Sequence, residues 1–199
     1  MPAPGVVRLP AAAAEDAGPA RGDDGTAPAV ARYALGFDGP AQALIHALKY
    51  SGRLGVADLL VSAAEGEARL IARAGADALV PVPLHASRRR ERGFNQAEVL
   101  ARGLSGPLGV PVAPGWLRRT RPTRTQTGLG RGERVVNVRG AFAAAPPPGV
   151  GAVLLVDDVV TTGATLSEAA AAFVCTGVHC SCFALVGAKR VDRAARGRL

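Results

Sequence analysis

An apolar strand followed by two acids and a threonine–glycine turn carries most of the chemistry in this sequence. The segment runs from Val153 to Leu166 and contains Asp157, Asp158, Thr161, Thr162, Gly163, Ala164 and Thr165. Gly163 lets the backbone turn tightly without a Cβ atom in the way. The start of the following helix offers free N–H groups and the positive end of the helix dipole, and threonine hydroxyls add donors. The pattern predicts a phosphate-binding loop.

The two acids lie beside this loop and are not suited to bind the phosphate itself. Asp157 and Asp158 can accept hydrogen bonds from vicinal ribose hydroxyls, or hold Mg²⁺, which prefers oxygen ligands. A phosphate loop next to a diacid predicts a ribose 5-phosphate site. The alternative is a strand-to-helix turn with Asp and Thr caps, but two of each around a glycine exceed what capping needs. The segment matches neither the Walker pattern nor the dinucleotide fingerprint.

The hydrophobic pattern supplies the elements that must position this loop. Apolar residues recur at helical spacing from Pro40 and again from Leu54 to about Ala74. Strands are predicted at 78–82, 152–156 and 179–186, and further helices at about 95–104 and 165–175. Strands that alternate with helices predict an α/β fold with an open, mainly parallel sheet flanked by helices. The loop then lies at the carboxyl edge of the sheet, where such folds bind ligands.

Composition divides the chain into three parts. Residues 1–32 are rich in Pro, Ala, Gly and Asp and are expected to be disordered or loosely packed. Residues 33–188 form one domain, and residues 189–199 form a basic tail. Inside the domain, Thr120 to Asn137 is polar and rich in arginine and glycine, which predicts a long exposed loop.

Charge and cysteine content indicate which classes of ligand and which compartment to expect. Much of the net charge of +8 comes from Arg88 to Arg92, Arg118 to Arg139 and Lys189 to Arg198, which can attract phosphates of any kind, including nucleic acid. Three cysteines near the C-terminus argue against a secreted disulfide scaffold. The sequence begins with no signal-peptide pattern and has no apolar run of about 18 residues, so we expect a cytoplasmic protein without a membrane partner.

The diacid and its loop closely resemble the signature of type I phosphoribosyltransferases, which bind phosphoribosyl pyrophosphate. Four further blocks resemble the competence protein F (ComF) family: residues 45–52, 80–85, 92–96 and 134–138. The resemblance implies the type I phosphoribosyltransferase fold, with a flexible hood loop over the substrate and Mg²⁺ as cofactor. Many members of this family begin with a zinc-binding cysteine cluster, whereas this sequence has no cysteine before Cys175.

The resemblance also implies roles for residues outside the diacid segment. Leu84, His85 and Arg88 fall where the superfamily binds pyrophosphate, in a loop that often contains a cis peptide; His85 could instead be a helix cap. Arg119, Arg124 and Gln126 fall in the hood. The candidate catalytic residues are Asp157, Asp158 and Arg119. Lys49 could reach a phosphate, but it also ends a helix, where a cation is favourable in any case.

Two functions follow from these features, with a third left open. The first is transfer of phosphoribose from phosphoribosyl pyrophosphate to an acceptor that the sequence does not specify. The second, implied by the family name, is single-stranded DNA binding in DNA uptake, with a DNA-uptake helicase as a partner. The arginine-rich loop contains no aromatic residue on which bases could stack, so nucleic-acid binding is expected to be weak and non-specific. The third is a sensor that binds the ribose phosphate without turnover.

Overall fold

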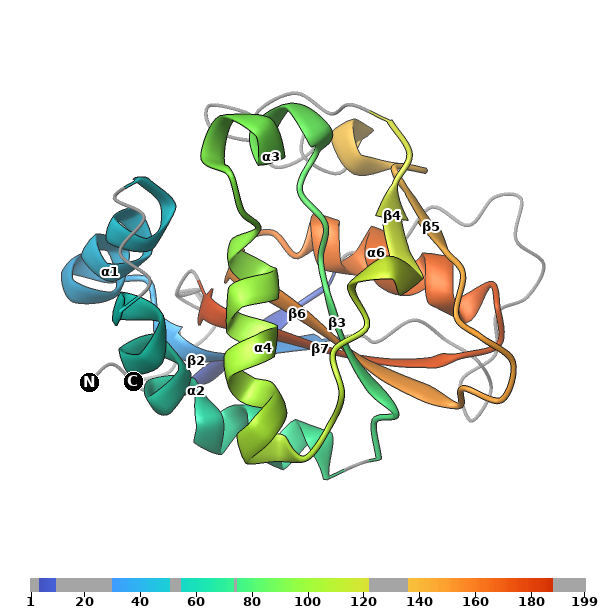
Figure 1. Ribbon diagram of the computed structural model, residues 1–199, viewed down its shortest axis with the longest axis horizontal. Helices are drawn as coiled ribbons and strands as arrows, with labels where there is room; N and C mark the ends of the chain where they lie inside the picture. Colours follow the sequence, from blue (N-terminus) through green and yellow to red (C-terminus); the bar gives the residue numbers. More distant parts are fainter. Residues whose placement is uncertain (1–3, 10–29, 51–54, 74, 122–135, 188–199) are drawn as a thin grey trace, which may run out of the picture.

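A five-stranded sheet with the order β1-β2-β7-β6-β3 lies at the centre of the protein (Figure 1). The computed structural model describes residues 4–9, 30–50, 55–73, 75–121 and 136–187. The strands are β1 (Gly5–Arg8), β2 (Val30–Gly36), β3 (Ala78–Pro81), β6 (Ala152–Val160) and β7 (His179–Gly187). Only β1 is antiparallel to its neighbour; the pairs β2–β7, β7–β6 and β6–β3 are parallel. This confirms the expected open, mainly parallel α/β sheet, and the arrangement is consistent with a phosphoribosyltransferase-like fold.

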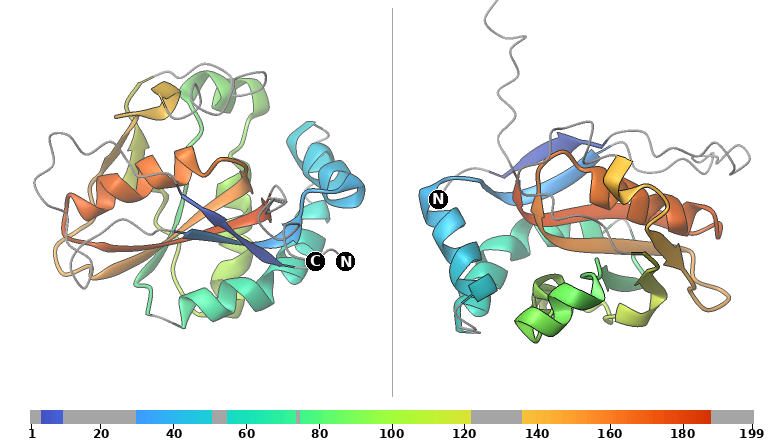
Figure 2. Two further views of the ribbon diagram at one scale, coloured as in Figure 1. Left: turned by 180° about the vertical axis from the view of Figure 1, so that it is seen from behind. Right: turned by 90° about the horizontal axis from the view of Figure 1, so that it is seen from above.

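Helices cover both faces of the sheet (Figure 2). On one face lie α1 (Gly39–Tyr50), α2 (Gly55–Ala72) and α4 (Gln96–Leu108), and on the other lies α6 (Ala164–Val174). A two-stranded sheet of β4 (Leu117–Arg119) and β5 (Phe142–Ala144) packs beside α6. The short helix α3 (Ala86–Arg92) follows β3, and the 3₁₀ turn η1 (Pro114–Trp116) precedes β4.

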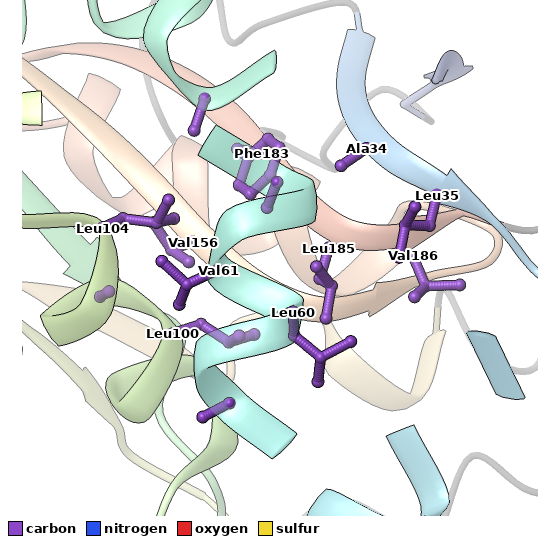
Figure 3. Packing of buried hydrophobic residues seen from close by; sticks show 14 of the residues in the cluster. Ala34, Leu35, Leu60, Val61, Leu100, Leu104, Val156, Phe183, Leu185 and Val186 are labelled. Atoms are coloured by element: carbon purple, nitrogen blue, oxygen red, sulfur yellow. The ribbon is translucent and has the colours of Figure 1, made fainter. Parts of the chain in front are cut away.

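Small aliphatic residues build the two cores, because the sequence offers few aromatic ones. Leu154 and Val156 of β6 face α2 and α4, together with Phe183 of β7 (Figure 3). Val153 and Leu155 face the other way, toward α6. This alternation is what a strand buried on both faces requires. It fixes which side chain of β6 can meet which helix further along the strand.

The structure differs from the expectation at the N-terminus. Gly5–Arg8 is a strand inside the segment for which composition predicts disorder, and β2 begins at Val30. Val7 is fully buried, so tertiary pairing with β2 outweighs the local composition. Residues 10–29 and 188–199, which contain most of the two expected tails, lie outside the described residues.

The parallel strands all end at one edge of the sheet. β2, β3, β6 and β7 point the same way, so the segments that follow β2, β3 and β6 meet at their carboxyl ends. These segments are the start of α1, residues 82–85 before α3, and residues 161–163 before α6. The candidate site is built at this edge.

Candidate functional site

A small pocket lies between the end of β6 and the start of α6. Its cavity volume is about 20 Å³, more than one water molecule needs. It is lined by Asp157, Val159, Val160, Thr161, Thr162, Gly163, Ala164, Thr165 and Leu166. The structure therefore brings together all the predicted ribose-phosphate residues except Asp158, which does not line the pocket.

The loop takes its shape from Gly163. This residue has φ of +80°, in the left-handed region, where a side chain is disfavoured. It stands at the N-cap of α6, and the first helical hydrogen bond runs from the Ser167 N–H to the Gly163 carbonyl at 2.9 Å. The Ala164 N–H donates to Thr162 Oγ1 at 3.4 Å. A helix start leaves its first N–H groups without intrahelical acceptors, so the loop presents donors to the pocket.

The strand before the loop is longer than the sequence predicts. β6 continues through the diacid to Val160, because Val159 and Val160 pair with Val186 and Gly187 of β7. The two acids are therefore strand residues, and successive side chains of a strand point to opposite faces. Asp157 lines the pocket, whereas Asp158 reaches α1, where its Oδ2 atom lies 2.6 Å from Lys49 Nζ.

Asp157 is an unusual carboxyl group. Burial, together with the negative charge of Asp158, raises its pKa to about 8. The Asp158 N–H donates to Asp157 Oδ1 at 2.8 Å, and this bond and the Lys49 charge offset part of the rise in the Asp157 pKa. Because a group with this pKa holds its proton through much of the neutral range, Asp157 can both donate and accept a hydrogen bond. A neutral carboxyl also repels a nearby phosphate less than a carboxylate would.

Arg119, one of the predicted hood residues, interacts electrostatically with the Asp157 carboxyl group. It lies on β4, half-buried, with its guanidinium 5.2 Å from the centre of the Phe142 ring on β5. Burial and the charge of Arg88 lower the Arg119 pKa, and the charge of Asp157 acts in the opposite direction. Arg119 therefore lies within electrostatic reach of both Arg88 and Asp157, although the three residues come from separate segments.

The predicted pyrophosphate residues follow β3. His85 is the N-cap of α3: its Nδ1 atom accepts from the Ser87 N–H at 3.3 Å and lies 2.7 Å from Ser87 Oγ. The capping role left open by the sequence is thus present. Leu84 precedes it, half-buried, and Arg88 lies in the first turns of α3. Every described peptide bond is trans, so the cis peptide implied for this loop is not found here.

The base of the expected hood is tied together and fastened to α6. The Thr120 N–H donates to the Ala141 carbonyl at 2.9 Å, and the Arg121 guanidinium donates to the Arg139 carbonyl. The Gly140 N–H donates to Glu168 Oε2 on α6 at 2.9 Å. Arg124 and Gln126, the other two hood candidates, lie outside the described residues.

Two residues that sequence reasoning did not assign prove to be important here. Lys49 was left undecided, and it forms the ion pair with Asp158. Asn95 caps α4 by accepting from the Ala97 N–H at 3.2 Å, and its side-chain amide donates to the Val82 carbonyl at 3.0 Å. Asn95 thereby fixes the segment after β3 to α4. Its position directly before a helical pattern was the available signal.

Whether Mg²⁺ fits this edge of the sheet depends on which side chains could coordinate it. Across the described ranges, no group of three or more His, Cys, Asp or Glu side chains is arranged to hold a metal ion. Of the two candidate ligands, Asp158 is already paired with an ammonium group and does not line the pocket. The diacid thus does not fit a magnesium ion held by both carboxylates.

Separately, no helix among the described residues is long and apolar enough to cross a membrane.

Comparison with known proteins gives a consistent set of relatives, although no family model matches the chain. "Competence protein F" of Haemophilus influenzae is 41% identical over 95 residues, which cover 46% of this chain and 42% of that protein. "DNA utilization protein YhgH" of Escherichia coli is 37% identical over 135 residues, 66% of this chain and 60% of that protein. "Competence protein ComFC" of Bacillus subtilis is 37% identical over 93 residues, 46% and 36% of the two chains.

These similarities cover only part of each relative. The chain spans between 36% and 60% of the length of these three proteins. They nevertheless agree with the sequence blocks and with the α/β sheet that carries the diacid loop. These similarities support assignment of the chain to the competence protein F (ComF) family.

Proposed function

We propose that the pocket between β6 and α6 binds the phosphorylated ribose of phosphoribosyl pyrophosphate. The observation that carries this proposal is the pocket lining: one protonatable acid and the continuous segment 159–166, which runs from the end of β6 through a left-handed glycine into α6. The N–H groups at the start of α6 and the hydroxyls of Thr161, Thr162 and Thr165 supply donors for phosphate oxygens. Asp157 exchanges hydrogen bonds with the ribose hydroxyls.

Charge placement supports transfer chemistry at the same edge. Cleavage of the bond between ribose C1 and pyrophosphate develops positive charge on the ribose and negative charge on the leaving group. Arg119, which lies within electrostatic reach of Asp157 and of Arg88, neutralises the pyrophosphate together with Arg88, next to Leu84 and His85. Magnesium brought in with the pyrophosphate would supply further positive charge there. A partly buried guanidinium is more effective in this role than one in open water.

The names of the relatives support a proposal about the biological process in which this site acts. Proteins named for competence and for DNA utilization are 37–41% identical to the chain over the matched regions. We propose a role related to DNA uptake or DNA use, in which the protein processes a ribose phosphate or, without turnover, senses it.

The arginine distribution favours a second candidate, direct binding of single-stranded DNA. Arg88, Arg89 and Arg90 of α3 lie at the same end of the molecule as β4, which carries Arg118 and Arg119 (Figures 1 and 2). Such a cluster attracts any polyphosphate, so an oligonucleotide would compete with phosphoribosyl pyrophosphate. If Z phosphates are neutralised, the logarithm of the affinity falls with a slope of about −0.7Z against the logarithm of salt concentration.

Calorimetric titration with phosphoribosyl pyrophosphate, ribose 5-phosphate and pyrophosphate tests the primary proposal. We expect wild type to bind the first two and Asp157→Asn to bind them at least about tenfold more weakly, because the amide has one acceptor oxygen whereas the carboxyl group has two for the vicinal ribose hydroxyls. Asp77→Asn is the matched control, since Asp77 lies before β3 at the opposite edge of the sheet and accepts from the Gly151 and Ala152 N–H groups. Equal affinity in wild type and Asp157→Asn would refute the assignment.

Two further measurements separate the functions. Release of pyrophosphate in the presence of a panel of bases and amines distinguishes transfer from sensing. A labelled oligonucleotide titrated at several salt concentrations, with and without phosphoribosyl pyrophosphate, distinguishes the two candidates. Tight DNA binding that survives high salt and ignores the small ligand would favour a dedicated nucleic-acid site.

A further inference from the structure

The ion pair between Lys49 and Asp158 joins helix α1 to strand β6. Lys49 lies in the last turn of α1, and its Nζ atom is 2.6 Å from Asp158 Oδ2. The two side chains are 21% and 15% exposed, so little water screens the contact. A short, poorly screened contact of this kind holds both groups in place more firmly than a surface ion pair does.

This contact occupies the position that a metal ion would need. Mg²⁺ binds oxygen atoms at about 2.0–2.1 Å in strict octahedral geometry and retains several waters. An ammonium group in direct contact with Asp158 Oδ2 blocks such coordination and repels a second cation.

The other carboxyl of the diacid does not restore a metal site. Asp157 lines the pocket between β6 and α6, whereas Asp158 contacts Lys49 on α1, so the two carboxyl groups are not arranged around one cation. No third acid, histidine or cysteine joins the two acids in the part of the chain that the structure describes. Without Lys49, the Asp158 carboxylate would have no cation beside it.

We infer that the Lys49 ammonium is the resident cation of the diacid, and that it takes the place of a divalent metal held by both carboxylates. Lys49 is therefore a positioning residue: it holds the Asp158 side chain in place, and it leaves Asp157 to face the ligand. Any magnesium arrives bound to the pyrophosphate rather than to the protein. This inference deepens the proposed function, because it states how the same site balances its charge.

The test measures binding of Mn²⁺ alone, by the electron paramagnetic resonance signal of the free ion. The proteins are wild type, Lys49→Met, Lys49→Arg, Asp158→Asn and the double variant Lys49→Met/Asp158→Asn. Methionine keeps much of the length of the lysine side chain without its charge, and arginine keeps the charge. A melting curve for each variant shows that it is folded.

We expect wild type and Lys49→Arg to bind Mn²⁺ weakly and equally. Lys49→Met should bind it at least about tenfold more tightly, because the Asp158 carboxylate then has no ammonium group beside it to neutralise it and to repel a second cation. The double variant should return to the wild-type affinity. Equal Mn²⁺ affinity in wild type and Lys49→Met would overturn the inference.

The comparison of wild type with Asp158→Asn keeps the test decisive if Lys49→Met does not fold. Equal, weak Mn²⁺ binding by these two proteins supports the inference, whereas a loss on Asp158→Asn shows that wild type already uses Asp158 as a metal ligand and overturns it. Because no ribose phosphate is present, the outcome is independent of whether phosphoribosyl pyrophosphate binds. Failure of the proposed function would appear only in the calorimetric titrations.

Discussion

Replacing Asp157 with asparagine should stabilise the protein increasingly as the pH rises from about 4 to about 8. Burial and the Asp158 charge raise the pKa of Asp157 from 3.8 to about 8. In this interval the folded protein keeps a proton that the unfolded chain releases, so the free energy of unfolding of wild type falls with rising pH. Asparagine is neutral in both states and does not have this dependence.

The size of the effect follows from the shift in the pKa of Asp157. Each unit corresponds to about 1.4 kcal/mol, so the full shift from 3.8 to about 8 corresponds to roughly 6 kcal/mol. Asp157 lines a pocket that water can enter, which reduces the cost of its ionised form. We therefore expect Asp157→Asn to gain about 2 kcal/mol over wild type between pH 5 and pH 8, and no more above that.

Urea unfolding of wild type and Asp157→Asn at several pH values measures this difference directly, because the titration of all other groups cancels. Asp77→Asn provides a control of opposite sign. Hydrogen bonds from the Ala152 and Gly151 N–H groups lower the Asp77 pKa, so its contribution to stability is lost as the pH falls through that pKa. A gap between wild type and Asp157→Asn that stays constant with pH would show that the Asp157 pKa is not raised.

Two further predictions concern the packing of helices and the capping of α4. In Gly103→Ala the new Cβ atom would lie 2.4 Å from Val61 Cγ2, so we expect a loss of about 1–3 kcal/mol in unfolding free energy, whereas Gly66→Ala on α2 has open space and should gain about 0.5–1 kcal/mol. A loss in both variants would point to a general intolerance of these helices. Asn95→Ala should cost about 1–2 kcal/mol, and Asn95→Asp should recover only the α4 cap, since a carboxylate cannot donate to the Val82 carbonyl. Chemical denaturation measures all four, and equal stability of Asn95→Ala and wild type would contradict the role of Asn95.

Local pattern was sufficient to predict the elements around the phosphate loop. The apolar run of β6, the left-handed position of Gly163 and the helix after it depend on residues close together in the sequence. The helices α2 and α4 were also predicted to within a few residues, because their apolar residues recur at helical spacing.

Contacts between distant segments could not be predicted in the same way. The Lys49 ammonium meets Asp158 only because α1 stands at the carboxyl edge of the sheet, and the position of α1 depends on its packing against α2. The same holds for Arg119, whose approach to Arg88 and Asp157 depends on how β4 and α3 are placed. The end of β6 was predicted four residues too early, since Asp157 and Asp158 have low strand propensity and pairing with β7 overrides it.

That misplaced boundary affects what the two acids can do. In a loop after Val156, both carboxyl groups could turn toward one cation. In a strand that continues to Val160, they face different partners: Asp157 the pocket, and Asp158 the ammonium of Lys49. A proton on the first and an ion pair at the second leave the diacid with almost no net charge. The phosphate of a ligand can then approach the loop without repulsion from the acids that would contact its ribose, which is the balance that an anionic sugar phosphate requires.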